Sequence, residues 1–104
     1  MIFYASILKG MLLNVKDQSL KVYYVYIVKC ADNTLYTGIA TQLDRRVEEH
    51  NSSDKGAKYT RVRRPVELVY SEEYPDRSSA SKREYEIKKK MTRKEKLALI
   101  EPSK

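Results

Sequence analysis

The sequence has little cysteine and no long apolar run, and both absences exclude classes of protein. Cys30 is the single cysteine among 104 residues, which excludes an intrachain disulfide framework and a cysteine-built zinc site. No apolar run approaches the roughly 20 residues that a membrane-spanning helix needs. The first 20 residues also lack the basic start, apolar core and small-residue cleavage site of a signal peptide. We therefore expect a soluble, cytoplasmic protein, associated with the nucleoid if it is bacterial.

The first 20 residues are predicted to stand apart from the folded part of the chain. Met11 offers a second start for translation, so we interpret residues 1–20 as a loosely held N-terminal arm or as sequence upstream of the true start. Residues 21–104 are then one small domain with a modest core.

The net charge is strongly positive. The chain has 21 lysines and arginines against 14 aspartates and glutamates, a formal charge of +7. Such an excess favours a polyanionic partner, nucleic acid before an anionic membrane surface, because each cation placed near a phosphate releases condensed counterions. A solvated basic face with no ligand explains the charge equally well, so composition alone leaves the partner open.

The hydrophobic pattern predicts an α+β fold with the order β-β-α-β-α-α. Strands are expected at residues 22–29, 35–40 and 66–74, and the first is apolar on both faces, as in a covered strand. Helices are expected at residues 42–50 after an N-cap at Thr41, from an N-cap at Ser78 or Ser79 to about residue 90, and from a Thr92–Glu95 capping box through residue 100. A small three-stranded, mainly antiparallel sheet flanked by helices buries these elements most economically.

Two of the predicted helices carry polar residues in their apolar stripes. Arg46 and His50 share a face with leucine and valine on the first helix, and Glu84 shares a face with isoleucine and methionine on the second. Burying such groups is costly unless they meet a partner or line a cavity. An Arg46–Glu84 ion pair that only fixes the packing is one interpretation. The alternative is a functional cleft, because several inward polar groups in one small domain usually mark one.

These residue types suit phosphodiester hydrolysis. Magnesium commonly takes one or two carboxylates and fills its other positions with water and substrate phosphate, so a lone Glu84 is sufficient. The Arg46 guanidinium can hold phosphate oxygens and offset charge that develops on them. A tyrosine whose pKa is lowered by a cation or by arginine could act as the general base.

At these positions the chain resembles the GIY-YIG nuclease superfamily, in its small standalone single-domain branch. The resemblance covers about residues 22–100. Its signature tyrosines match Tyr26 in Tyr24-Val-Tyr and Tyr36 in Tyr36-Thr-Gly38; its helix arginine, following histidine and metal-binding glutamate match Arg46, His50 and Glu84. Five such positions in the expected order and on the expected elements make a specific match. Tyr24 and Thr37 replace a glycine and an isoleucine of the two signatures.

The resemblance implies a metal-dependent DNA endonuclease, in DNA repair, recombination or processing. The sequence leaves open whether RNA is also a partner. It implies that Glu84 holds Mg²⁺ or Mn²⁺, that Tyr26 or Tyr36 activates water, and that Arg46 stabilises charge on the phosphate. It also implies that His50 orients the site or assists proton transfer, and that Gly38 lets backbone or phosphate approach closely. No membrane partner is expected, and target choice would come from DNA structure or from a protein partner.

The register of the first hairpin tests this interpretation. For Tyr26 and Tyr36 to face the same cleft, the numbers of paired residues must add to an even sum, because side chains alternate between the faces of a strand. That condition predicts a hairpin loop of three or five residues, whereas a two-residue turn would put the tyrosines on opposite faces.

A basic segment after the first helix supports a different hypothesis. In a non-catalytic, structure-selective nucleic-acid-binding domain, a tyrosine would stack on an exposed base while its cationic neighbours grip phosphates. The nucleic-acid-binding candidates of this segment are Lys58, Tyr59, Arg61, Arg63 and Arg64. Both hypotheses use this segment, and they differ in whether Glu84 is needed. A third hypothesis is a protein-interaction role that retains a relict site.

Overall fold

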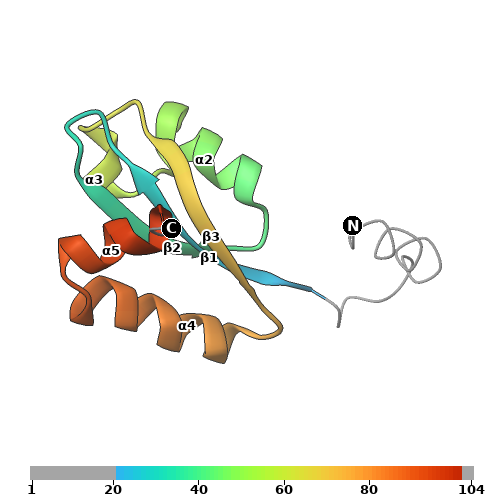
Figure 1. The fold of residues 1–104 in the computed structure, drawn as a ribbon. Helices are drawn as coiled ribbons and strands as arrows, with labels where there is room; N and C mark the ends of the chain where they lie inside the picture. Colours follow the sequence, from blue (N-terminus) through green and yellow to red (C-terminus); the bar gives the residue numbers. More distant parts are fainter. Residues whose placement is uncertain (1–20, 102–104) are drawn as a thin grey trace.

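The computed structural model describes residues 21–101, and the predicted arm at residues 1–20 lies outside them (Figure 1). The elements follow in the order β1 (Tyr23–Lys29), β2 (Leu35–Ala40), α2 (Leu43–Ser52), α3 (Lys58–Arg61), β3 (Glu67–Tyr74), α4 (Arg77–Tyr85), η2 (Glu86–Lys90) and α5 (Arg93–Ile100). The predicted β-β-α-β-α-α order is confirmed, with two additions. The short helix α3 lies in the basic segment, and η2 is a π-helical extension of α4.

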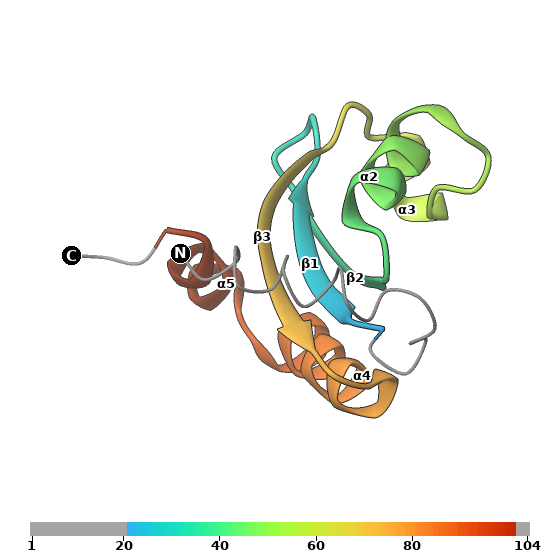
Figure 2. The same ribbon diagram turned by 90° about the vertical axis from the view of Figure 1, so that its right-hand side faces the viewer.

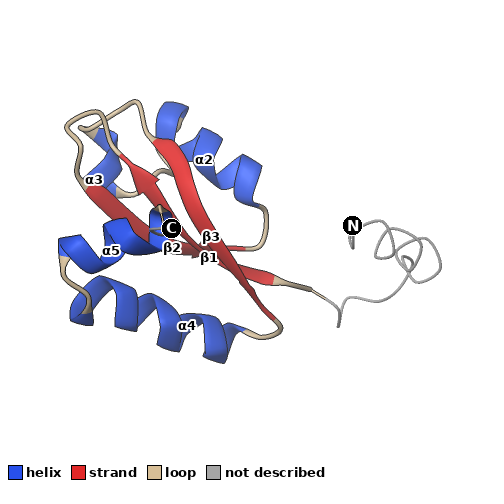
Figure 3. Ribbon diagram, viewed as in Figure 1, coloured by secondary structure: helices blue, strands red, loops and turns tan. Residues whose placement is uncertain are grey.

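The sheet is antiparallel, with strand order β2-β1-β3. Because β1 is central, its consecutive residues 25–28 are all buried, as the unbroken apolar run predicted. Helices α2 and α3 lie on one side of the sheet, and α4 and α5 lie toward the other (Figures 2 and 3). Alternate β1 side chains therefore enter two separate cores.

Each core belongs to one face of β1. Val25 and Ile27 pack with Ala80 of α4 and Ile87 of η2. On the other face the buried core consists of Tyr26, Val28, Cys30 and Val66, packed against partly buried side chains of α2. Tyrosine therefore takes a core position on the α2 face, and its hydroxyl needs a polar partner there.

The hairpin register is confirmed. Tyr26 pairs with Gly38 and Val28 pairs with Tyr36, so the even sum holds and both tyrosines share a face. Five residues, 30–34, separate the last paired residues of the two strands. Asn33 adopts the left-handed conformation with φ of 70°, which asparagine tolerates better than most residues. The loop therefore has the odd length that the shared cleft required.

The helix starts were predicted less accurately than the helices. The N-cap of α2 is Gln42, without a side-chain cap, in place of Thr41. The N-cap of α4 is Asp76, whose carboxylate accepts from the Ser79 amide, in place of Ser78 or Ser79. An aspartate accepts the amide three residues on as well as serine does, so the sequence offered competing caps. The Thr92 capping box at α5 is confirmed.

No helix among residues 21–101 is long and apolar enough to cross a membrane.

Candidate active site

A buried line of hydrogen bonds joins β1, α2 and α3. The Tyr26 hydroxyl lies 2.7 Å from His50 Nε2, and His50 Nδ1 lies 2.8 Å from Thr60 Oγ1. All three residues are at most 1% exposed. His50 reaches the line because it occupies the inward stripe of α2, as its spacing predicted. The polar stripe therefore meets partners from the sheet and from α3.

Gly38 makes room for the ring of Tyr26. The two residues are paired across the hairpin, and a Cβ atom at position 38 would lie 2.5 Å from the Tyr26 hydroxyl. Any larger residue would displace the phenol. In the structure the close approach at Gly38 is made by the tyrosine side chain of the partner strand, in place of the backbone or phosphate that was expected.

Tyr36 stands beside the same histidine. Its ring centroid lies 5.4 Å from that of His50 in an edge-on arrangement, and 5.9 Å from that of Tyr59 in a stacked one. Lys88 of η2 places its ammonium group 5.3 Å from the centroid of Tyr36. Both signature tyrosines thus converge on His50, from neighbouring strands.

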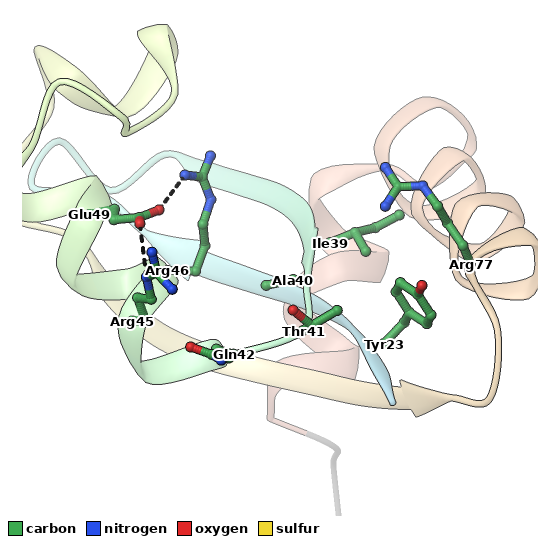
Figure 4. A pocket seen from close by; sticks show the side chains of 9 residues that line it. All are labelled: Tyr23, Ile39, Ala40, Thr41, Gln42, Arg45, Arg46, Glu49 and Arg77. Carbon is green, nitrogen blue, oxygen red and sulfur yellow. Dashed lines mark hydrogen bonds and ion pairs between the residues drawn. The ribbon is translucent and has the colours of Figure 1, made fainter. Parts of the chain in front are cut away.

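Arg46 lies on the same face of α2 and opens onto a pocket. Its guanidinium donates to Glu49 at 2.9 Å and to the Lys55 carbonyl at 2.8 Å. The pocket has a volume of about 330 Å³ and is lined by Tyr23, Ile39, Ala40, Thr41, Gln42, Arg45, Arg46, Glu49 and Arg77 (Figure 4). Three arginines against one glutamate give this pocket a positive character, which favours an anionic ligand.

Glu84 lies in the inward stripe of α4, with its side chain 26% exposed. It pairs with Lys88 at 3.4 Å, while Arg46 pairs with Glu49, so each of the two has another charged partner. The proposed Arg46–Glu84 packing pair is therefore absent from the ion pairs of the described residues. The inward polar residues of α2 and α4 therefore do not neutralise each other.

The donor set around Glu84 decides which metal it could hold. The described residues contain no cluster of three or more histidine, cysteine, aspartate or glutamate side chains. Structural and catalytic zinc sites need three or four such protein ligands. Magnesium accepts one carboxylate with water and substrate oxygens, so the partly exposed Glu84 fits a hydrated Mg²⁺ or Mn²⁺ ion.

Burial keeps the hydrogen-bonded pair of Tyr26 and His50 neutral. Burial of Tyr26 raises the pKa of its phenol to about 12, although the nearby Arg46 guanidinium acts in the opposite direction. Burial, together with the positive charge of Arg46, lowers the pKa of His50 to about 4. The expectation of a lowered tyrosine pKa is therefore wrong for Tyr26 in the protein alone. At neutral pH the phenol keeps its proton and the imidazole is uncharged.

The basic segment is only partly free for a ligand. Lys58 and Arg61 are exposed. Arg64 donates to the carbonyl oxygens of His50 and Ser53, both at 2.6 Å, so it fastens the segment to the end of α2. The Arg64 guanidinium is therefore occupied by contacts within the protein rather than available to a ligand.

Two further members of the segment are also engaged within the protein. Arg63 binds Asp32 of the hairpin loop at 3.1 Å, and its guanidinium carbon lies 3.9 Å from the centroid of the Tyr59 ring. Tyr59 is 37% exposed and stacks on Tyr36, so its ring already has aromatic and cationic neighbours. Tyr59 and Arg63 therefore belong to the group of side chains around Tyr36, whereas Lys58 and Arg61 do not.

Sequence reasoning missed two residues of the site. Thr60 completes the buried line of hydrogen bonds, but a threonine among arginines in a predicted loop gave no inward signal. At Gly56 a Cβ atom would lie 2.8 Å from the Glu49 carbonyl, so this glycine lets the loop after α2 pass close to the helix. A glycine in a polar loop was the one available sign of that close contact.

Comparison with known proteins agrees with this arrangement. The model of the GIY-YIG catalytic domain matches residues 22–97. The chain therefore belongs to the GIY-YIG family. The GIY-YIG family is one of nuclease-type hydrolases that act on nucleic acid and generally use a divalent metal ion.

Within that family the chain is similar to UPF0213 proteins. It is 70% identical to one from Desulfotalea psychrophila over 64% of this chain and 60% of that protein, so it spans less than two thirds of that relative. It is 60% identical to one from Staphylococcus aureus over 75% of this chain and 93% of that protein. A solution structure of a protein from E. faecalis is 44% identical, with a TM-score of 0.51 over 73% of this chain and 79% of the other. The predicted fold and the small standalone branch are thus confirmed.

Proposed function

We propose that the protein is a divalent-metal-dependent endonuclease that hydrolyses phosphodiester bonds in DNA. The observation that carries the proposal is the buried Tyr26–His50 hydrogen bond, which stands on the same face of the sheet as Tyr36 and within electrostatic range of Arg46 and Glu84. A hydrogen-bonded phenol and imidazole can move a proton, and a guanidinium and a carboxylate close enough to shift the pKa of that phenol can bind phosphate and cation. A role in DNA repair, recombination or processing remains a prediction from the resemblance.

Glu84 is the proposed metal ligand, with Mg²⁺ or Mn²⁺ as the ion. When bound, such an ion supplies Lewis-acid stabilisation of charge on the phosphate oxygens. The ammonium group of Lys88, 3.4 Å from the Glu84 carboxylate, holds that side chain in place on the helix. In our proposal the Glu84 carboxylate would exchange this contact for the ion that it would hold.

Tyr26 and His50 are proposed to act together as the base. The neutral pair begins with the proton on the Tyr26 oxygen. As water attacks phosphorus, its proton passes to this oxygen, while the phenolic proton passes to His50 Nε2. The water oxygen forms the new bond to phosphorus, and the bond to the leaving ester oxygen breaks. That oxygen takes a proton from solvent, and the imidazolium releases one.

Arg46 is proposed to hold the phosphate. Its contacts with Glu49 and the Lys55 carbonyl fix the guanidinium, so little rotamer freedom is lost on binding. A fixed donor aimed at developing negative charge is worth more than a mobile one, because it needs no reorganisation during reaction. Tyr36, wedged between the rings of His50 and Tyr59, is proposed to border the same phosphate.

Cations around the site are proposed to contact the flanking DNA. Exposed Lys58 and Arg61 lie on one side, and the pocket with Arg45 and Arg77 opens beside Arg46. Removing one phosphate contact should weaken binding to all sequences and reduce the salt dependence by about one counterion.

The experiment that tests the proposal is cleavage of labelled linear, nicked and branched DNA, and of RNA, with Mg²⁺ or Mn²⁺ and with an EDTA control. We expect metal-dependent cutting that falls at least about a hundredfold in Glu84→Gln, with DNA affinity kept or raised. Glu73→Gln, at an exposed position of β3, is the matched control and should cut normally. Salt-sensitive binding without cutting of any substrate would replace the proposal with the binding-domain hypothesis. The absence of both would favour a protein-interaction role.

A further inference from the structure

Thr60 occupies an unusual position for a hydroxyl. It is fully buried, on a short helix among exposed cations, and it touches the far nitrogen of the histidine that binds Tyr26. Its Oγ1 lies 2.8 Å from His50 Nδ1 and 3.0 Å from the carbonyl oxygen of Ala57. No buried side-chain polar atom of the described residues lacks a partner, so this hydroxyl is part of a complete network.

The direction of these hydrogen bonds follows from counting protons. A carbonyl oxygen can only accept, so the one hydroxyl proton of Thr60 goes to Ala57, a backbone contact that threonine makes readily within a helical turn. The Thr60 oxygen is then an acceptor toward His50, and Nδ1 must carry a proton. A neutral imidazole has one N–H, so Nε2 is left with its lone pair facing Tyr26.

One backbone contact of His50 favours the opposite tautomer. The backbone amide of Ala57 also points at His50 Nδ1, at 3.4 Å. If it donated there, Nδ1 would accept, Nε2–H would point at Tyr26, and the Thr60 proton would leave Ala57 for the ring. This amide contact is the longest of those that meet at Thr60 and Nδ1, whereas the bonds to the ring and to the Ala57 carbonyl are 2.8 and 3.0 Å.

We infer that Thr60 is a positioning residue that fixes the tautomer of His50, so that Nε2 accepts the proton of Tyr26. With the opposite tautomer, Nε2 already carries a proton and cannot take the phenolic one, and the proton transfer proposed above has no acceptor. The importance of Thr60 for rate rests on the proposed function. The tautomer itself is a property of the folded protein and does not.

The experiment is nitrogen-15 NMR of the histidine ring, in the full chain, near pH 7. His50 is the only histidine, so the two ring signals need no assignment by mutation. We expect Nδ1 to be protonated in the wild type. In Thr60→Val the ring should change to the Nε2–H form, because the Ala57 amide can then donate to Nδ1. Thr60→Ser should restore Nδ1–H. A wild-type ring protonated at Nε2, or a valine variant that keeps Nδ1–H, overturns the inference.

Cleavage kinetics then test the effect of Thr60 on rate separately from its effect on the tautomer. Thr60→Val should lower kcat by about 10- to 100-fold with little change in KM, as expected for the loss of a group that orients another one, and Thr60→Ser should rescue kcat. A changed tautomer with unchanged kcat would refute the positioning role while leaving the nuclease intact. If the wild type cuts nothing, the proposed function fails, and the NMR result still decides the tautomer.

Discussion

Two tyrosine-rich polar clusters lie on opposite faces of this small sheet, and they are built on different principles. On the α2 face, Tyr26 binds a neutral histidine. On the α4 face, the Glu72 carboxylate is held by both ends of the Arg83 guanidinium at 2.9 Å and by the hydroxyls of Tyr70 and Tyr74. The first cluster, the buried line of Tyr26, His50 and Thr60, contains no charged group. The second is an ion pair to which two tyrosine hydroxyls add hydrogen bonds.

The comparison shows what each kind of cluster can do. Burial alone would raise the pKa of Glu72, but the hydrogen bonds from Arg83 and the two tyrosines outweigh it and lower the pKa to about 2. This carboxylate keeps its charge at all ordinary pH values, so the cluster suits packing. The Tyr26–His50 pair stays neutral and can exchange a proton, so it suits chemistry. One interpretation of the sequence was a structural ion pair between Arg46 and Glu84. The structure instead has such a pair between Arg83 and Glu72, on the other face of the sheet.

The largest expected difference between the clusters is in rate. Tyr26→Phe should lower kcat by about 10²- to 10⁴-fold, because it removes the hydroxyl that relays the proton. Tyr74→Phe, which removes a hydroxyl from the other cluster, should leave kcat unchanged and affect only stability. Single-turnover cleavage of the preferred DNA measures both variants. Equal losses would mean that the two clusters cannot be assigned separate roles.

A smaller loss of rate is expected for Gly38→Ala. The new methyl group would meet the Tyr26 hydroxyl and push the phenol away from His50. Misplacement of a reacting group by about 1 Å can cost around 100-fold, so we expect kcat to fall by about 10- to 100-fold. Gly56→Ala is the comparison variant. Because its methyl group crowds the backbone atoms of Glu49 and His50, it should lower the melting temperature in addition to kcat. An alanine at position 38 with normal kcat would show that Tyr26 does not need its observed place.

The charged cluster should dominate in stability. Glu72→Ala leaves Arg83 and two tyrosine hydroxyls without their shared acceptor, and we expect the free energy of unfolding to fall by about 1–3 kcal/mol. Glu73→Ala, the next residue on the same strand and exposed, should change it by less than about 0.5 kcal/mol. Urea denaturation measures both. Equal effects would remove the structural role assigned to Glu72.

The two clusters should also lose stability in different pH ranges. The folded pKa of His50, about 4, lies below its ordinary value of 6.5, so the unfolded chain binds the proton first and stability falls between those values. For Glu72 the corresponding fall lies between 4.5 and about 2. Each group gives a slope of up to about 1.4 kcal/mol per pH unit. Unfolding measured from pH 7 to 3 should lose its upper phase in His50→Gln and keep the lower one. A variant that retains the upper phase would assign it to another group.

The elements of the fold were predictable because each had a local cause. The unbroken apolar run at residues 25–28 marks a covered central strand. The alternation of side chains gives the hairpin loop an odd length once Tyr26 and Tyr36 are required to share a cleft, as the resemblance implies. Arg46, His50 and Glu84 stood out because helical spacing put polar groups among apolar ones. These signals lie within a single helix or hairpin, so the sequence contains them.

The partners of these residues could not be predicted, because they come from distant segments. Thr60 and His50 are ten residues apart and meet where the basic segment folds back on α2, a contact to which Arg64 contributes. Arg83 lies outside the apolar stripe of its helix, which gave no sign of a buried partner, yet it meets Glu72 of β3. The pKa of Tyr26 depends on how much burial outweighs Arg46, and the amino-acid pattern does not contain that balance.

The pairing of Tyr26 with Gly38 couples the two halves of the family signature through steric contact. A ring from one strand fills the volume that the opposite residue leaves empty, so neither position can drift alone. A side chain gained at position 38 would displace the phenol and lower activity, unless the ring at position 26 had already been reduced. A chain that had reduced this ring would have given up its hydroxyl. Loss of the glycine is therefore expected to accompany or follow loss of the tyrosine, and the order of the two changes would record when a lineage abandoned the chemistry.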